Sequence, residues 1–304
     1  MSRLIFRQGL EMLLIVFGVS TILFFAMRST GDPAAVIAGP NASGEQVEAI
    51  RQQLGLTAPL TTQYRTFLID LVHLRFGDSL LLQVPAVRLV LEALVPSLVL
   101  VGVSIVVTVC VAVPLGVVAA VKRNSPLDGA VRVVVLLGQS MPPYWLGLLL
   151  ILVFAVKLRV TPSFGYGDAR HLILPAVTLS MFLLAKLVRL TRANVLEVLG
   201  RDFVRTARAK GLSEMSVMFK HALRNALLPV IIIIAVDFGQ LFGGAVIVET
   251  IFSWPGLGQR LVQSVLSRDF PVIQATVFLI ALIVTVSNTL AEVLARLVDP
   301  RLRA

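Results

Sequence analysis

Residues 197–229 read EVLGRDFVRTARAKGLSEMSVMFKHALRNALLP, a basic stretch that lies between two strongly apolar parts of the chain. Arg201, Arg205 and Arg208 recur at helical spacing, which predicts one polar face of a first helix. The apolar residues of this helix are predicted to turn away from that face: Phe203, Val204 and Ala207. Gly211 follows and can adopt the left-handed conformation that ends a helix. The stretch therefore predicts a helix that stops at a sharp turn.

A second helix is predicted directly after the turn. Ser213 is well placed to cap it through its hydroxyl group, and Met215, Phe219, Leu223 and Ala226 follow on one stripe. Two interpretations are open: a basic cytoplasmic loop that only sets membrane orientation, or an element that docks onto a partner protein.

The composition indicates a membrane protein. Hydrophobic residues make up 57% of the 304 residues and charged residues 14%, and the mean hydropathy is +0.90, which is too apolar for an ordinary soluble domain. The sequence contains six apolar runs of about twenty residues, each long enough to cross a bilayer. They cover residues 9–29, 97–121, 131–156, 171–191, 227–249 and 272–294. The sequence therefore predicts an all-α integral membrane protein with six transmembrane helices.

The first run has a competing interpretation as a cleaved signal peptide. Ala26-Met27-Arg28 offers no small-x-small cleavage site and Glu11 lies early in the run, so we expect an uncleaved first span.

Lys and Arg residues predict the orientation. About seventeen lie on the segments that are inside when both termini are cytoplasmic, against about ten on the outer segments. Nine lie between Lys186 and Arg224. We therefore predict a multi-pass protein of the inner (cytoplasmic) membrane with both termini cytoplasmic.

Residues 30–96 form the one sizeable polar segment and are predicted to lie outside. Its acids outnumber its four arginines: Asp32, Glu45, Glu48, Asp70, Asp78 and Glu92. We expect an external segment of mildly negative charge.

Asp237 lies about ten residues into an apolar run, where a carboxylate must face protein or water rather than lipid. Three roles are open at this stage: it lines a transport path, it pairs with another polar group, or it binds the coupling ion of a secondary carrier.

The segments RTARAKG and HALRNALLP resemble the cytoplasmic loop motif of permease subunits of bacterial ABC importers, in the dipeptide, oligopeptide and nickel branch. Arg205, Thr206 and Ala207 stand at the Glu-Ala-Ala positions of the general motif, and Gly211 stands at its glycine. The resemblance covers nearly the whole length of the chain.

Other segments carry the resemblance further. His221, Leu223 and Arg224 depart from the Ile-x-Leu-Pro of the general motif in a way that fits this branch. The stretch 249–258, ETIFSWPGLG, is similar to the outer-loop signature of the branch, and Asp299-Pro300-Arg301 also matches. Ala291-Glu292-Val293 departs from the expected Asp-x-x-Tyr.

The resemblance implies one importer transmembrane domain of type I over residues 1–304, with an external subdomain at 30–96 between its first two helices. It also implies a coupling-helix loop at 197–226 that inserts into a cleft of an ATPase subunit. The coupling residues are expected to be Arg201, Arg205, Thr206, Ala207, Arg208, Lys210 and Gly211. Phe252 and Trp254 are expected to be either an external gate or interfacial anchors.

The resemblance implies partners rather than cofactors. We expect a second permease subunit in a heterodimer, ATP-binding cassette ATPase subunits that bind the ATP, an extracytoplasmic substrate-binding protein, and membrane lipid. The chain itself has no G-x-x-x-x-G-K-[ST] phosphate loop, so no ATPase activity and no bound cofactor are expected of it.

Other sites are not expected. His73, His171 and His221 are far apart in the chain and do not predict a metal site. Nucleic-acid binding is not expected either, because the basic residues lie on a short loop between membrane spans, where the positive-inside bias accounts for them.

The predicted function is that of a permease subunit of an ATP-driven importer for peptides or a related small solute, a nickel chelate among them. The alternative is an ion-coupled secondary carrier that uses Asp237. Against it, the two halves of the chain show no clear hydropathy repeat, which many carriers have.

Overall fold

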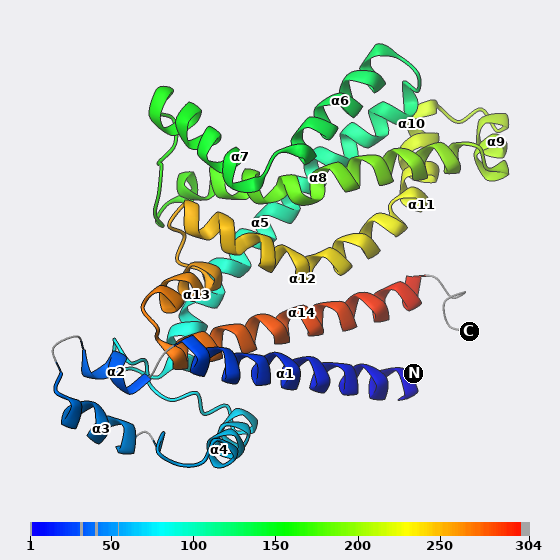
Figure 1. Ribbon diagram of the computed structural model, residues 1–304. Helices are drawn as coiled ribbons and strands as arrows, with labels where there is room; N and C mark the ends of the chain where they lie inside the picture. Colours follow the sequence, from blue (N-terminus) through cyan, green and yellow to red (C-terminus); the bar gives the residue numbers. More distant parts are fainter. Residues whose placement is uncertain (1, 31–32, 40–41, 54, 299–304) are drawn as a thin grey trace. The chain divides into compact units, whose positions relative to one another are not determined.

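The computed structural model describes residues 2–30, 33–39, 42–53 and 55–298 (Figure 1). In these ranges every regular element is helical, apart from an isolated bridge between Asp78 and Pro85. The Asp299-Pro300-Arg301 motif and Asp32 lie outside the described residues. The chain divides into two compact units, Met1–Pro96 with Gly256–Thr285, and Ser97–Pro255 with Val286–Ala304.

Five helices in the described ranges are long and apolar enough to cross a membrane. They are α1 (Ser2–Thr30), α5 (Ala86–Val121), α8 (Ala169–Leu199), α12 (Leu228–Ile251) and α14 (Phe270–Val298). A sixth span results when a bent pair of helices is counted as one. The prediction of an all-α protein with six spans is therefore confirmed with that pair included.

The bent pair consists of α6 (Pro126–Ser140) and α7 (Pro143–Leu150), which continues as the π-helix η1 (Ile151–Lys157). The two parts meet at an angle of 104°. Met141 and Pro142 are extended, with ψ angles of 128° and 136°, because a residue that precedes proline is driven out of the helical region. The predicted span 131–156 is thus broken at its Pro142-Pro143 pair.

Two helices extend beyond the predicted apolar runs. The helix α5 begins at Ala86 and runs through Pro96, although the sequence placed the start of the second span at residue 97. Its first turns bury Leu89, Val90 and Ala93, and this apolar burial extends the helix. The helix α8 continues to Leu199 rather than residue 191.

In the first unit, the 30–96 segment forms three short helices. They are α2 (Pro33–Ala38), α3 (Gly44–Gln53) and α4 (Leu60–Val72). Phe24 of α1 is 1% exposed and its ring lies 5.1 Å from the rings of Tyr64 and Phe67 of α4. The Thr21 hydroxyl lies 2.8 Å from the Tyr64 hydroxyl. Aromatic packing and one hydrogen bond therefore hold α4 on α1.

A buried carboxylate ties the loop before α5 to the turn between α13 (Leu257–Leu266) and α14. Asp269 is 4% exposed and accepts hydrogen bonds from the Ser79 hydroxyl and from the backbone N–H of Leu80, the latter at 3.1 Å. Phe270 and Ile273 form an apolar cluster directly after it. This contact holds the loop before α5 against the start of α14.

In the second unit, α8 packs on α5, α6, α7 and α12. Leu179, Leu187 and Val195 of α8 are completely buried. At Gly116 of α5 an added Cβ atom would lie 2.6 Å from the Thr191 Cβ and 3.0 Å from the Val188 carbonyl oxygen. Gly116 therefore allows a close approach of α5 and α8.

We expect Gly116→Ala to lower the stability of the purified chain by about 1–3 kcal/mol, because the methyl group forces two packed helices apart. The measurement is thermal unfolding in detergent. Gly102→Ala in the same helix is the matched control, since an added Cβ there meets nothing within 4 Å, and it should leave the melting temperature unchanged or raise it. Equal melting temperatures of the two variants would contradict the close approach.

Candidate functional site: the basic loop and the buried charge pairs

The basic loop folds as a short helix, a turn and a second helical stretch at the end of α8. These elements are α9 (Asp202–Ala209), α10 (Glu214–Ser216), the π-helix η2 (Val217–Leu223) and α11 (Arg224–Ala226). Val204, Ala207 and Val217 form a buried cluster with Val198 and Leu199 of α8. The loop therefore packs on the last turns of α8.

The turn has the predicted geometry. Gly211 has a φ angle of +76°, in the left-handed region. The Ser213 hydroxyl accepts a hydrogen bond from the backbone N–H of Ser216 at 3.4 Å and caps α10. Arg208 donates two hydrogen bonds, 2.8 Å and 3.2 Å long, to the Glu214 carboxylate across the turn. The bond to Arg208 lowers the pKa of Glu214 and raises the pKa of Arg208, so the pair is charged at neutral pH.

The charged face of α9 is exposed as predicted. Arg205 has 78% of its side chain exposed, and Arg201, Thr206 and Lys210 are exposed as well. Ala207, which the resemblance placed among the coupling residues, is buried instead, because it packs under the helix with Val204. Phe203 was predicted to turn inward with them but is 44% exposed, since it lies at the edge of this narrow contact.

The predicted apolar stripe of the second helix was wrong in part. Met215 and Phe219 are 70% and 56% exposed, whereas Val217, Ala222 and Ala226 are buried. The cause is the π-helix, which adds a residue to the turn and so replaces the expected spacing of three and four. The loop consequently exposes apolar side chains as well as arginines.

Asp237 pairs with a lysine of the neighbouring helix. Its two carboxylate oxygens lie 2.9 Å and 2.8 Å from the Lys186 Nζ. The Asp237 side chain is 8% exposed and that of Lys186 is 46% exposed. Of the roles open for Asp237, pairing with another polar group is thus present in the structure.

Sequence reasoning missed Lys186 as the partner. It treated Lys186 as a charge of the inner loop, whereas the residue lies well inside α8. The signal was available, because Lys186 falls within the predicted span 171–191, where a cation requires a partner or water.

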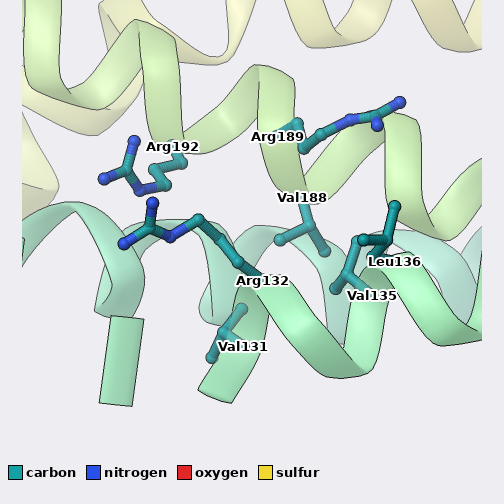
Figure 2. Close-up of a pocket in the computed structure, with 7 residues that line it drawn as sticks. All are labelled: Val131, Arg132, Val135, Leu136, Val188, Arg189 and Arg192. Atoms are coloured by element: carbon teal, nitrogen blue, oxygen red, sulfur yellow. The ribbon is translucent and has the colours of Figure 1, made fainter. Parts of the chain in front are cut away.

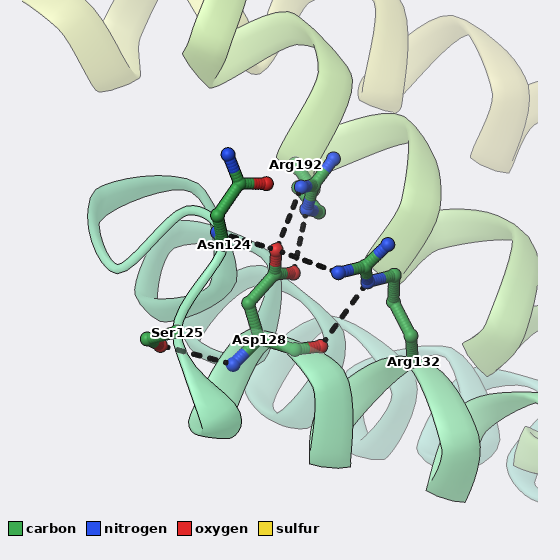
Figure 3. Close-up of polar contacts among 5 residues, drawn as sticks. All are labelled: Asn124, Ser125, Asp128, Arg132 and Arg192. Atoms are coloured by element: carbon green, nitrogen blue, oxygen red, sulfur yellow. Dashed lines mark hydrogen bonds and ion pairs between the residues drawn. The ribbon is translucent and has the colours of Figure 1, made fainter.

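A second buried carboxylate joins α6 to α8 (Figure 3). The side chain of Asp128 is 0% exposed. Arg192 Nε and Nη2 each lie 2.8 Å from one of its two oxygens, and Arg132 Nη2 lies 3.2 Å from Oδ2. The backbone N–H of Asn124 donates to Oδ2 at 3.1 Å, and the Ser125 hydroxyl accepts from the N–H of Asp128. Asp128 is therefore fully satisfied by a bidentate arginine, a second arginine and a helix cap.

The sequence contained a signal for this cluster that was not used. Ser125 and Asp128 have the spacing of a capping box, in which a hydroxyl residue precedes an acid by three positions. The two arginines had been counted only toward membrane orientation.

The outer-loop signature is buried in the fold. Phe252 and Trp254 are 2% and 3% exposed. The Tyr166 ring packs edge-on against Trp254 with centroids 4.7 Å apart, and the N–H of Gly165 donates to the Phe252 carbonyl oxygen at 2.9 Å. The alternative that both aromatic residues are interfacial anchors is therefore wrong, because neither side chain reaches the surface of the chain.

Glu249 of the same signature was missed as a structural residue. It is completely buried in α12 and accepts a hydrogen bond from the Ser97 hydroxyl of α5 at 2.6 Å. Among the residues that the structure describes, no group of three or more His, Cys, Asp or Glu side chains could hold a metal ion.

The sequence matches a known family over nearly its whole length. Residues 112–304 match the binding-protein-dependent transport system inner membrane component, and residues 1–84 match the N-terminal part of such membrane components. The chain belongs to this family of ABC importer permeases.

Relatives of known annotation align with this chain over its whole length. The chain is 40% identical, over 100% of its own length and 99% of theirs, to a putative peptide transport system permease protein of Brucella abortus (strain 2308) and to the glutathione transport system permease protein GsiC of Escherichia coli (strain K12). A solved structure of the inward-facing MetNI methionine ABC transporter is similar in fold, with a TM-score of 0.60 and 21% identity over 70% of this chain and 97% of that chain. The secondary-carrier alternative finds no support in these matches.

We expect the Lys186–Asp237 pair to be coupled energetically. Asp237→Asn should destabilise the purified permease by about 2 kcal/mol because it leaves a lysine unpaired beside an apolar interface; the loss is smaller than for a fully buried pair since Lys186 is 46% exposed. Adding Lys186→Gln to Asp237→Asn should recover part of that loss. Unfolding measurements on the two single variants and the double variant give the coupling energy, and strictly additive losses would show that the contact is without energetic weight.

Proposed function

We propose that this permease moves peptides or a related small solute such as glutathione inward across the cytoplasmic membrane, with ATP hydrolysed by partner ATPase subunits. The relatives at 40% identity support this substrate class, since their names describe peptide and glutathione transport. Neither name refers to nickel, so a nickel chelate is the weaker choice. ATP is bound by the partners, and this chain needs no cofactor of its own.

The observation that carries the proposal is the surface of the basic loop. Arg205, Met215 and Phe219 are exposed on an ordered helix, turn and helix that the Arg208–Glu214 pair braces. An exposed phenylalanine and methionine beside arginines suit a protein partner better than water. A loop that only set membrane orientation would need the charges but not this apolar surface.

The proposed transporter consists of this permease, a second permease subunit, ATPase subunits and a substrate-binding protein. We propose that residues 1–304 act as one importer transmembrane domain that pairs with a second permease subunit, and that residues 197–226 are the coupling loop for the ATPase. The residues of the loop proposed to act in coupling are Arg201, Arg205, Thr206, Arg208, Lys210 and Gly211, while Ala207 supports them from below. The external segment 30–96 would receive the extracytoplasmic substrate-binding protein, and lipid would surround the spans, with both termini cytoplasmic.

The burial of four side chains supports proposals for the transport path and for the external gate. Lys186 and Asp237 put charge into the apolar part of α8 and α12, which favours a place beside a water-lined path over one beside lipid. Phe252 and Trp254 close the outer end of the second unit with buried aromatic surface and are proposed as the external gate.

Energy coupling tests the function itself. The permease reconstituted with its second permease, the ATPase subunits and the binding protein should accumulate peptide only when ATP is present, because the chain carries no nucleotide-binding loop. The permease alone in proteoliposomes should neither hydrolyse ATP nor accumulate peptide. Uptake that follows a proton or sodium gradient without ATP would overturn the importer in favour of the carrier.

The shape of the turn tests the coupling loop. Gly211→Val should uncouple ATP hydrolysis from uptake, because a β-branched residue is strained at a φ angle of +76°, although an added Cβ meets nothing within 4 Å. We expect a loss of about fivefold or more in peptide moved per ATP hydrolysed, since strain of roughly 1–3 kcal/mol corresponds to a factor of about 5 or more. Gly211→Asn is the control, since asparagine tolerates the left-handed region, and it should stay near wild type. Wild-type coupling in Gly211→Val would remove the turn from the mechanism.

A further inference from the structure

A pocket of about 370 Å³ lies between α6 and α8 in the second unit (Figure 2). Three of the residues that line it are arginines and the others are apolar: Val131, Arg132, Val135, Leu136, Val188, Arg189 and Arg192. In Figure 2 the Arg132 and Arg192 guanidinium groups lie together at one end, and Arg189 extends from α8 at the other end, near Leu136. The pocket is thus amphipathic, with cationic groups at both ends of an apolar wall.

The pocket carries excess positive charge. Asp128 is shared by Arg132 and Arg192, so one carboxylate faces two guanidinium groups. Among the described residues, no carboxylate lies within salt-bridge distance of Arg189. The Asp128 pairing also fixes the positions of Arg132 and Arg192, so two of the three cations are held in place before any ligand arrives.

The pocket lies near one membrane surface. The connection from α5 to α6 holds Lys122 and Arg123, and Asp128 sits in the first turn of α6 directly after it. Under the proposed orientation this is the cytoplasmic surface, but the chemistry of the pocket does not depend on that choice.

We propose that this pocket binds the headgroup of an anionic phospholipid, with an acyl chain along Val131, Val135 and Leu136. A phosphodiester matches the guanidinium groups, which form paired hydrogen bonds to phosphate oxygens. Basic pockets between transmembrane helices at the cytoplasmic side bind lipid headgroups of this kind. The apolar wall distinguishes this ligand from free phosphate, which would gain nothing from valine and leucine side chains.

Arg189 provides the test because its removal leaves the Asp128 contacts intact. The full-length chain in detergent is incubated with equal amounts of phosphatidylglycerol and phosphatidylcholine, and retained lipid is measured by native mass spectrometry. Wild type should retain phosphatidylglycerol preferentially, and Arg189→Gln should lower that retention about fivefold, as expected for one arginine near the headgroup. Arg123→Gln removes the same charge from the nearby connection and should retain lipid as wild type does. Matching melting temperatures for both variants establish that the comparison is between folded proteins.

Several outcomes would overturn the proposal. They are unchanged retention in Arg189→Gln, an equal loss in Arg123→Gln, or displacement of the lipid by excess inorganic phosphate, which would indicate a small-anion site.

A photoreactive residue in place of Leu136 in the assembled transporter should cross-link to phosphatidylglycerol, whereas a cross-link to the second permease would assign the surface to a subunit interface. Lipid retention requires neither ATP nor transport, so its failure would leave the proposed function untouched.

Discussion

A charged side chain inside a bilayer must be paired or hydrated, and α8 is the helix on which this constraint acts most strongly. It carries Lys186, Arg189 and Arg192 within a span that the apolar composition places in the membrane. Lys186 is matched by Asp237 of α12, and Arg192 is matched by Asp128 of α6. These two ion pairs specify which helices lie next to α8, because apolar packing alone would tolerate many neighbours.

The transmembrane helices were predictable from the sequence because the hydropathy signal is strong. The residues at which these helices begin and end were not predictable. Apolar runs of bilayer length identified the spans, and Gly211 with Ser213 identified the turn, since both depend on local chemistry. The extension of α5 back to Ala86 depends on the burial of Leu89 and Val90. Burial of this kind overrides a proline that locally predicts a boundary.

The sequence indicated where the candidate site lies in the chain, but it did not predict which side chains contact each other there. The loop and Asp237 were both singled out, but the pairs Lys186–Asp237 and Arg192–Asp128 were not predicted, because ion pairs between helices leave no periodic pattern along the chain. The exposed faces of Met215 and Phe219 were missed for a different reason. The π-helical segment Val217–Leu223 changes the rotation of the residues before it relative to those after it, and a helical wheel with 3.6 residues per turn does not predict that change.

The length of α8 has a mechanical consequence. Residues Ala169–Leu199 form one continuous helix, about 46 Å long at 1.5 Å per residue, which exceeds the hydrocarbon core of about 30 Å. The basic loop packs on its last turns through Val198 and Leu199, and the lysine of the charge pair lies about 20 Å back along the same helix axis. In the coupling role proposed for the loop, a sideways force on α9 would act at one end of this helix, and Lys186, which lies nearer the middle of the helix, would shift by a smaller distance against Asp237.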